Sequence, residues 1–330
     1  MSLIINDTSY SGTYASYFIL PATFAMDTIE KGAVYVQDGI KKKHTIDRMD
    51  FSQPLQPRQA TPTSQGAFTI DGRVLTPQDI MLYTEFNPRN FEQNFLAEQL
   101  SRTLLARELP VTAENYMMQI GLNRAMEQIE TGLWMGSTTY TATPGSTGNG
   151  QLVFFDGFLK KMVNDSAVWQ VPSPVALTTT NILAAMTSCI NLLATNKKAL
   201  LARSSAHTRL KFFVSVNTAQ IYQAALTEGL TFKGVNTMEV GQNKPYKGFE
   251  VVILAGLPDD TILFCEGLMD TSSNLWVGMN SMEDNNLQLM RLQNNSELFF
   301  LKALIKYDVQ YGFSNEIALY TTLTAASFNA

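Results

Sequence analysis

The sequence contains few of the side chains that carry out acid–base, nucleophilic or metal chemistry in proteins. It has two histidines, His44 and His207, and two cysteines, Cys189 and Cys265. Neither histidine belongs to a metal-ligand motif. The cysteines are far apart, and each lies in an apolar stretch, which favours two buried free thiols over a disulfide or a metal site. We therefore expect neither a metal nor a cofactor.

Two pairs of adjacent acids are the other residues that could do chemistry. Asp259-Asp260 lies in a turn sequence, where solvated acids are far more common than a general acid–base pair. Glu283-Asp284 precedes two asparagines and offers oxygen ligands for calcium, but without the ordered spacing of a calcium-binding loop. The sequence also lacks nucleophile-elbow, phosphate-loop, zinc-protease and dinucleotide-binding motifs. These residues predict a protein that is not an enzyme.

The composition indicates a globular chain with a largely uncharged surface. Of 330 residues, 45% are hydrophobic, which is enough for one large core or two smaller ones. Only 16% are charged, against about 25% in an average soluble domain. Such a surface favours contact with other protein, although a monomer that uses asparagine, glutamine, serine and threonine on its surface has the same composition. The net charge is −5, and the one compact basic run, at 41–43, is flanked by Asp38 and Asp47, so no nucleic-acid-binding surface is predicted.

Targeting and membrane signals are absent from the pattern of the sequence. Residues 1–7 have no basic segment that leads into an apolar one, and no stretch approaches 18 uninterrupted apolar residues. We expect a chain of cytosolic origin, with an untrimmed N-terminus and no membrane partner.

The first 86 residues lack the pattern of a self-contained domain. Residues 1–35 carry scattered aromatics with only a short helix expected at 24–30, which is typical of an arm that docks on another surface. After a short strand expected at 34–36, residues 36–86 hold short strands at 44–46, 67–70 and 73–75, with a proline- and glycine-containing loop or hairpin tip at 52–66. Asp71-Gly72 is predicted to be a two-residue hairpin turn between the last two strands. A segment this irregular suits a protruding flap that other subunits cover.

Two helices and an α/β region follow. The first helix is expected over 90–108 and the second over 112–135, where the apolar residues Met118, Leu122, Met126, Ile129 and Leu133 form one stripe. Residues 137–150 read as a flexible connector. Beyond it we expect a helix at 180–199, a buried strand at 212–216 and a helix capped by Asn217. Strands are expected at 249–255 and 262–266, two long ones at 286–292 and 298–310, and a short one at 317–323.

This order of elements resembles the Hong Kong 97-type shell fold of tailed-bacteriophage major capsid proteins, which encapsulins share. The local sequences that carry the resemblance are the strand and helix beginning Phe212-Phe213-Val214-Ser215-Val216, the strand pair near 247–252 and 262–266, and the closing strand and tail over 298–320. The resemblance covers nearly the whole chain in element order, without an invariant signature.

The resemblance implies an α+β protein with four parts. Residues 1–35 would form the N-terminal arm and 36–86 the extended β-hairpin loop. Residues 87–150 and 286–313 would form the peripheral domain with the spine helix, and 151–285 with 314–330 the axial α/β domain.

The function implied by the resemblance is that of a structural major capsid protein. It would assemble as pentamers and hexamers into the icosahedral head of a tailed phage, in the cytoplasm of the host bacterium, and become part of the virion. It would enclose double-stranded DNA without sequence-specific binding, with separate scaffolding, portal and decoration proteins as further partners. We expect inter-subunit contacts from apolar residues of the arm and loop, namely Tyr14, Phe18, Phe51, Leu55 and Phe68.

Three alternatives stay open at this point. An encapsulin-like compartment shares the fold and encloses enzymes instead of a genome. A small-ligand-binding or catalytic α/β protein would have its site within 151–285. A tail or baseplate component is the third.

Overall fold

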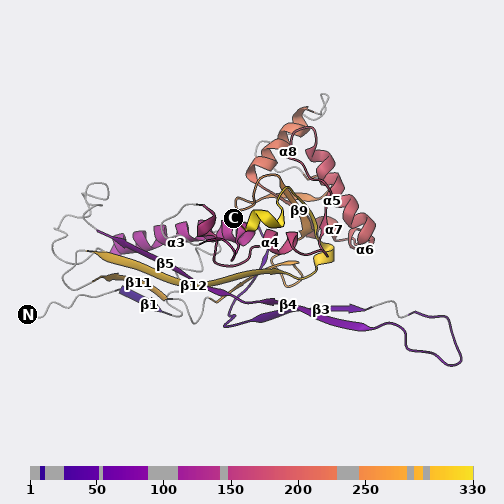
Figure 1. Cartoon of the computed structure of the whole chain (residues 1–330), viewed down its shortest axis with the longest axis horizontal. Helices are drawn as coiled ribbons and strands as arrows, with labels where there is room; N and C mark the ends of the chain where they lie inside the picture. Colours follow the sequence, from indigo (N-terminus) through magenta and orange to yellow (C-terminus); the bar gives the residue numbers. More distant parts are fainter. Residues whose placement is uncertain are drawn as a thin grey trace, which may run out of the picture.

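The computed structural model describes residues 8–11, 26–51, 55–87, 111–141, 148–228, 245–280, 286–292 and 298–329. Three regions are visible in Figure 1: a long helix packed on an elongated sheet, a wedge of helices around a second sheet, and a two-stranded hairpin that extends away from both. We call these the peripheral part, the axial part and the hairpin. The predicted helix at 90–108 lies outside the described residues.

The long helix α3 spans Val111–Met135, close to its predicted bounds. All five residues of the predicted apolar stripe are buried. The helix ends where Gly136 meets the chain at 155–157, since a Cβ on Gly136 would lie 2.5 Å from the Phe155 carbonyl oxygen. A glycine is needed there for close backbone contact.

The peripheral sheet has six strands. Five follow the order β1-β11-β12-β10-β2, and the sixth, β5, also pairs with β12. Residues of β12 alternate between buried positions facing α3 and partly exposed positions on the outer face, as the sequence predicted for this strand. Gln78–Phe86, placed with the extended loop by the sequence analysis, forms β5 and pairs with β12. The strands are β1 (Thr8–Ser11), β2 (Tyr35–Gln37), β5 (Gln78–Phe86), β10 (Leu275–Met279), β11 (Asn286–Arg291) and β12 (Phe299–Tyr311).

The axial sheet has five strands, in the order β6-β13-β9-β7-β8, and both of its faces are buried. Ile262 and Phe264 of β9 face a core shared with α5 and α8, whereas Leu263 and Cys265 face the core that also contains α3. Strand alternation therefore joins two cores through one sheet. The elements are β6 (Trp169–Gln170), β7 (Leu210–Val214), β8 (Glu250–Ile253), β9 (Thr261–Glu266), β13 (Ala318–Thr321), α5 (Ile182–Asn196), α6 (Lys198–Leu201), α7 (Ala206–Arg209) and α8 (Val216–Glu228).

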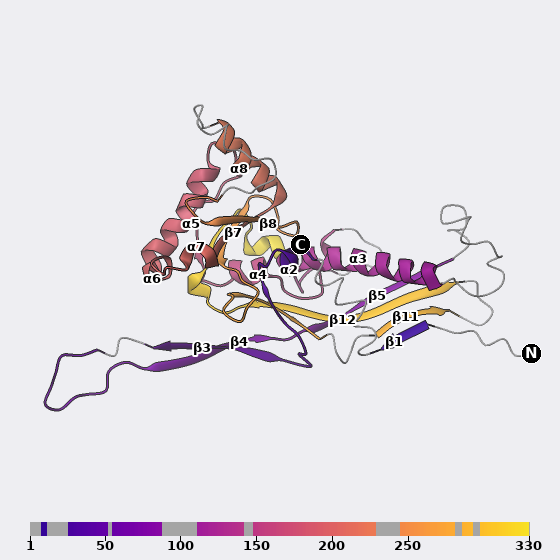
Figure 2. The ribbon, with the colours of Figure 1, turned by 180° about the vertical axis from the view of Figure 1, so that it is seen from behind.

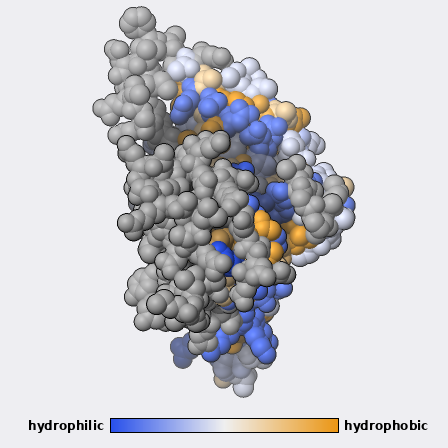
Figure 3. Space-filling model, turned by 90° about the vertical axis from the view of Figure 1, so that its left-hand side faces the viewer, coloured by the Kyte–Doolittle hydropathy of each residue, from blue (hydrophilic) through white to orange (hydrophobic). Residues whose placement is uncertain are grey.

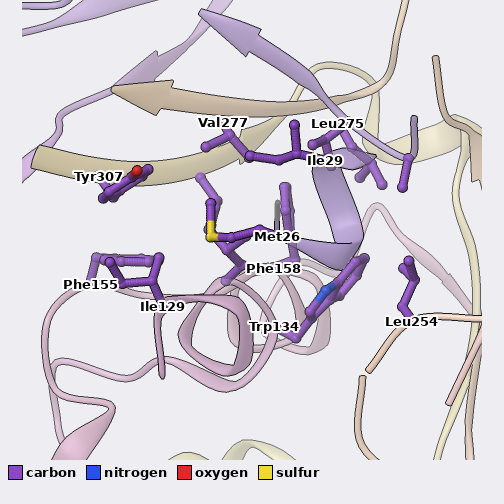
Figure 4. Packing of buried hydrophobic residues seen from close by; sticks show 14 of the residues in the cluster. Met26, Ile29, Ile129, Trp134, Phe155, Phe158, Leu254, Leu275, Val277 and Tyr307 are labelled. Atoms are coloured by element: carbon purple, nitrogen blue, oxygen red, sulfur yellow. The ribbon is translucent and has the colours of Figure 1, made fainter. Parts of the chain in front are cut away.

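Short helices close the gaps between these layers. Figure 4 shows Met26, just before α2, and Ile29, within α2, in the same core as Trp134 and Phe158, between α3 and the strands. The C-terminal helix η6 is tied to the end of α3, where Ser137 Oγ donates to the Phe328 carbonyl at 2.7 Å. These helices are α2 (Asp27–Glu30), α4 (Phe158–Val163), η3 (Asn149–Gln151), η5 (Ser314–Glu316) and η6 (Ala325–Phe328).

The predicted cap of α8 is wrong by two residues. The Thr218 amide donates to Ser215 Oγ at 3.1 Å, so Ser215, not Asn217, caps the first turn. Because strand β7 already ends at Val214, the helix begins one residue before Asn217. A capping side chain accepts from an amide two or three residues later, and Ser215 is in that position for a helix that begins at Val216.

The predicted Asp71-Gly72 turn is also wrong. The hairpin consists of β3 (His44–Phe51) and β4 (Phe68–Leu75), which pair without interruption, and Gly72 lies opposite Asp47 in mid-strand. The glycine has a packing reason, since a Cβ there would lie 2.5 Å from Thr45 Cγ2 across the ladder. The chain reverses instead between Phe51 and Phe68, which includes the loop predicted at 52–66.

Candidate functional site

The hairpin carries large apolar side chains on one face that are mostly exposed to solvent in the subunit. Met49 lies directly opposite Ile70, and Phe68 lies two residues before Ile70 on the same face of β4. Their exposed fractions are 70%, 71% and 70%, and Val74 extends the face toward the base. Large apolar residues grouped on one exposed face indicate a protein-binding surface. We call this set, Met49, Phe68, Ile70 and Val74, the hairpin face.

The opposite face of the hairpin is buried at its base. Leu75 and Ile46 alternate with the exposed residues and form a small cluster with Ile40 and Trp276. Trp276 belongs to β10 and Leu75 is fully buried, so the hairpin is fastened to the peripheral sheet by apolar contact. Figures 1 and 2 agree that the rest of the hairpin extends away from this base.

A partly buried ion pair forms a second attachment of the hairpin. Arg73 on β4 reaches Asp165, just beyond α4, at 2.5 Å, and its guanidinium lies 4.3 Å from the ring centroid of Tyr311. Tyr311 also donates to Asp165 Oδ2 at 2.9 Å. Burial opposes ionisation of Asp165, but hydrogen bonds from the Ala167 amide, Arg73 and Tyr311 outweigh it, and the pKa of Asp165 is lowered. These bonds connect the base of the hairpin to Asp165 and to Tyr311 at the end of β12.

The link from the hairpin to β5 is fixed by a third contact. The Thr76 amide donates to Asp308 Oδ2 at 2.8 Å, while Lys161 on α4 pairs with Asp308 Oδ1 at 3.0 Å. Asp308 belongs to β12 and is buried. The direction in which β4 leaves the sheet is therefore set by the peripheral part itself.

A second apolar surface lies on the outer face of the peripheral sheet, opposite α3. Met81 and Tyr83 of β5 are 58% and 46% exposed, and the Tyr83 ring stacks on Phe300 at 5.9 Å. Lysines of β12 interrupt these side chains, and Lys306 pairs with Asp79 at 3.4 Å. We call Met81, Tyr83 and Phe300 the outer sheet face. Figure 3, which looks at the end of the molecule away from the hairpin, also shows apolar patches among polar atoms.

The residues considered for chemistry have structural roles where they are described. Asp259 accepts from Ser215 Oγ and Asp260 from the Leu177 amide, both at 2.7 Å, so the two carboxylates serve different partners. Cys189 and Cys265 are buried free thiols, as predicted, and burial raises the pKa of Cys189 to about 12. Glu283-Asp284 lies outside the described residues.

The described residues contain neither a cluster of metal-ligating side chains nor a membrane-spanning helix. No three histidine, cysteine or acidic side chains in that part of the chain gather closely enough to hold a metal ion. None of its helices has both the length and the apolar character to cross a bilayer.

The predicted contact residues fall into three groups. Tyr14 and Phe18 lie outside the described residues, and Phe51 is placed only as the last residue of β3. Leu55, in the loop, is 91% exposed, and Phe68 lies on the hairpin face. Sequence reasoning missed Met49, Ile70 and Val74, although period-two spacing with Phe51 and Phe68 would have found them once one uninterrupted strand was assumed. That these residues contact another subunit stays a prediction.

Comparison with known proteins gives matches in structure but not in sequence. No protein-family model and no curated protein matches the chain. A chain of the satellite phage P4 procapsid, solved with its size-determination protein, superposes with a TM-score of 0.56 at 11% identity, over 93% of this chain and 99% of that one. A chain of Mycobacterium phage Che8 gives a TM-score of 0.52 at 12% identity, over 96% and 93%.

A third similar structure is the virus-like particle from Pyrococcus furiosus. Its TM-score is 0.50 at 8% identity, over 93% of this chain and 97% of that one. These matches cover more than 90% of each chain, at 8–12% sequence identity, so the similarity is one of fold. They confirm the predicted α+β fold class: the chain has the Hong Kong 97-type shell fold.

Proposed function

We propose that this protein is the major capsid protein of a tailed bacteriophage, which assembles with copies of itself into an icosahedral head around double-stranded DNA. Its role is structural rather than catalytic. The observation that carries the proposal is the hairpin face. Phe68 and Ile70 are about 70% exposed on a hairpin that extends away from the core of the subunit. Side chains of this size gain free energy when another chain covers them.

The outer sheet face supports a specific mode of contact. In the proposed shell the hairpin of one subunit lies on the peripheral strands of the next, against their outer sheet face, where Met81 and Tyr83 are exposed apolar side chains. The arm reaches a neighbour as well, and the axial parts meet around five-fold and six-fold centres. Many moderate contacts of this kind add up through multivalency.

The four-part division of the chain is proposed together with this function. The arm, extended loop, peripheral domain and axial domain follow the predicted limits, except that β2, β5 and β10 pair into the peripheral sheet, as β1 of the arm also does. Scaffolding, portal and decoration proteins would be separate chains, and assembly in the host cytoplasm would place the product in the virion.

Negative-stain microscopy of the purified protein tests the proposal. We expect closed particles of uniform diameter, on the order of tens of nanometres. A matched variant replaces residues 52–67 by Asn-Gly, so that Phe51 and Phe68 become the flanks of a two-residue hairpin turn and the subunit core is unchanged. Normal particles from this variant would show that residues 52–67 are not needed for assembly. A monodisperse monomer from the unaltered chain would refute the proposal itself.

The encapsulin-like compartment is the alternative with the same fold. Particle content separates the two, because a capsid carries double-stranded DNA and a compartment carries protein cargo. Nuclease-resistant DNA in particles taken from the native source supports the capsid, and an enclosed enzyme without DNA supports the compartment.

A further inference from the structure

The short helix α2 joins the axial part to the long helix α3. Figure 2 shows it between the end of α3 and the axial sheet. Asp27 accepts from the Ala255 amide at 2.8 Å, and Lys31 donates to the Ile253 carbonyl at 2.7 Å, both at the end of β8. On its other side Thr28 is bonded to Glu130 in α3. One turn of helix therefore bridges two parts of the molecule.

Glu130 and Thr28 are paired at two points. The Thr28 amide donates to Glu130 Oε2 at 3.2 Å, and Thr28 Oγ1 is bonded to Glu130 Oε1. Trp134 Nε1 can only donate, and it does so to Thr28 Oγ1 at 2.9 Å. The bond between Oγ1 and Oε1 can use either the threonine proton or a proton on the acid. The geometry consequently accepts both the ionised and the neutral form of Glu130.

The surroundings of Glu130 favour the neutral form. Its residue is only 5% exposed, and no lysine, arginine or histidine of the described chain forms an ion pair with it. On α2, Asp27 and Lys31 pair with each other at 2.6 Å, and on α3, Glu127 pairs with Arg124. From the β8–β9 connection, residues 254–260, the Gly256 amide reaches Glu130, whereas Asp259 and Asp260 accept from Ser215 Oγ and the Leu177 amide. A buried carboxylate without a cation is costly.

We infer that Glu130 and Thr28 form a proton-dependent joint, in which neutral Glu130 keeps α2 docked and ionised Glu130 weakens the docking. The joint goes beyond the proposed function, since it concerns how two parts of one subunit are held together. A cavity of about 480 Å³ beside it, lined by Met126, Glu130 and Gly256 among others, gives the ionised side chain room to take up water.

The sign of the pH dependence follows from the direction of the pKa. Burial raises the pKa of Glu130 above its ordinary 4.5, and the negative charge of Asp27 adds to this, while hydrogen bonds from Thr28 and Gly256 oppose it. The docked state therefore holds the proton more tightly than the undocked state. Docking is strongest at and below pH 4.5 and weakens as the pH rises through the raised pKa.

Hydrogen exchange of the full chain, read by mass spectrometry on peptides covering 26–33 and 253–257, tests the joint. After correction for the intrinsic exchange rate, protection in both peptides should fall as the pH rises from about 4.5 to 8, by at most about tenfold per pH unit because one proton is linked. The variant Glu130→Gln imitates the neutral acid, with one acceptor for the Thr28 amide and one donor for Oγ1. Its protection should be high and independent of pH.

The matched control is Glu127→Gln, one turn earlier on α3, which removes an exposed carboxylate that also lines the cavity. It should keep the wild-type profile. A flat or rising wild-type profile would overturn the inference, and so would a Glu130→Gln profile equal to wild type. If Glu130→Gln does not fold, the inference also fails, because a side chain of the same shape and neutral charge is expected to fit.

Discussion

Removing the apolar side chains of the hairpin face should uncouple assembly from folding. In the double variant Phe68→Ala and Ile70→Ala, two side chains that are 70% and 71% exposed in the subunit are cut to methyl groups. Full burial of such a side chain contributes about 1.5–3 kcal/mol, so covering the exposed seven-tenths contributes about 1–2 kcal/mol each. The variant should lose about 2–4 kcal/mol of association free energy per subunit, which is a roughly 30- to 700-fold higher concentration for assembly.

Sedimentation velocity across a concentration series measures the point at which particles replace free subunits. Urea unfolding of free subunits should show a smaller loss of unfolding free energy, about 0.4–2 kcal/mol, because the variant removes two cross-strand pairs that contribute roughly 0.2–1 kcal/mol each. Val175→Ala, which trims a 58% exposed side chain of the axial part, controls for a general loss of apolar surface. An unchanged assembly concentration, or a shift matched by an equal loss of subunit stability, would refute the role of the hairpin face.

Three further substitutions probe how the subunit holds the hairpin and the joint. Leu75→Ala should lower the unfolding free energy by about 2–5 kcal/mol in urea titrations, since the side chain is fully buried at the hairpin base, and a loss below about 1 kcal/mol would contradict that burial. Gly256→Ala should cost about 1–3 kcal/mol in the same assay, because a Cβ there would lie 2.5 Å from the Glu130 carbonyl oxygen; wild-type stability would show that the turn can shift freely. Since the pKa of Asp165 is lowered below 3.8, its contribution is complete at neutral pH and is lost as the pH falls through that lowered pKa; Arg73→Gln should reduce this acid-dependent loss, and an unchanged slope of stability against pH between about 2 and 5 would argue against the ion pair.

Elements with a long, regular pattern were predictable from the sequence. The apolar stripe of α3 and the alternation of β12 each repeat over several turns or residue pairs, so one periodicity dominates. β9 shows the limit of this reasoning. All six of its residues are buried because each face of the axial sheet meets a different core, and a continuous apolar run gives no sign of which residue faces which core.

The joint could not have been predicted from the sequence. Thr28 and Glu130 are separated by 102 positions, and neither residue type stands out in its local pattern. Acids on amphipathic helices usually face water, so the pattern of α3 gives no sign that Glu130 is buried. It is buried because α2, which is only four residues long, covers that side of α3. Long-range contacts of this kind follow from the fold and not from spacing.

The Asp71-Gly72 error shows why local turn signals must be weighed against the strands beside them. A turn there would leave β3 to pair with only Arg73-Val74-Leu75, and the apolar residues Phe68 and Ile70 would lose their partners Phe51 and Met49. The longer register pairs eight residues on each strand and places Met49, Phe68 and Ile70 on one face. Cross-strand pairs each contribute roughly 0.2–1 kcal/mol, so the additional pairs outweigh the preference of one dipeptide for a turn. The same register creates the exposed hairpin face. The cross-strand pairing that stabilises β3 and β4 therefore also forms the surface proposed for assembly.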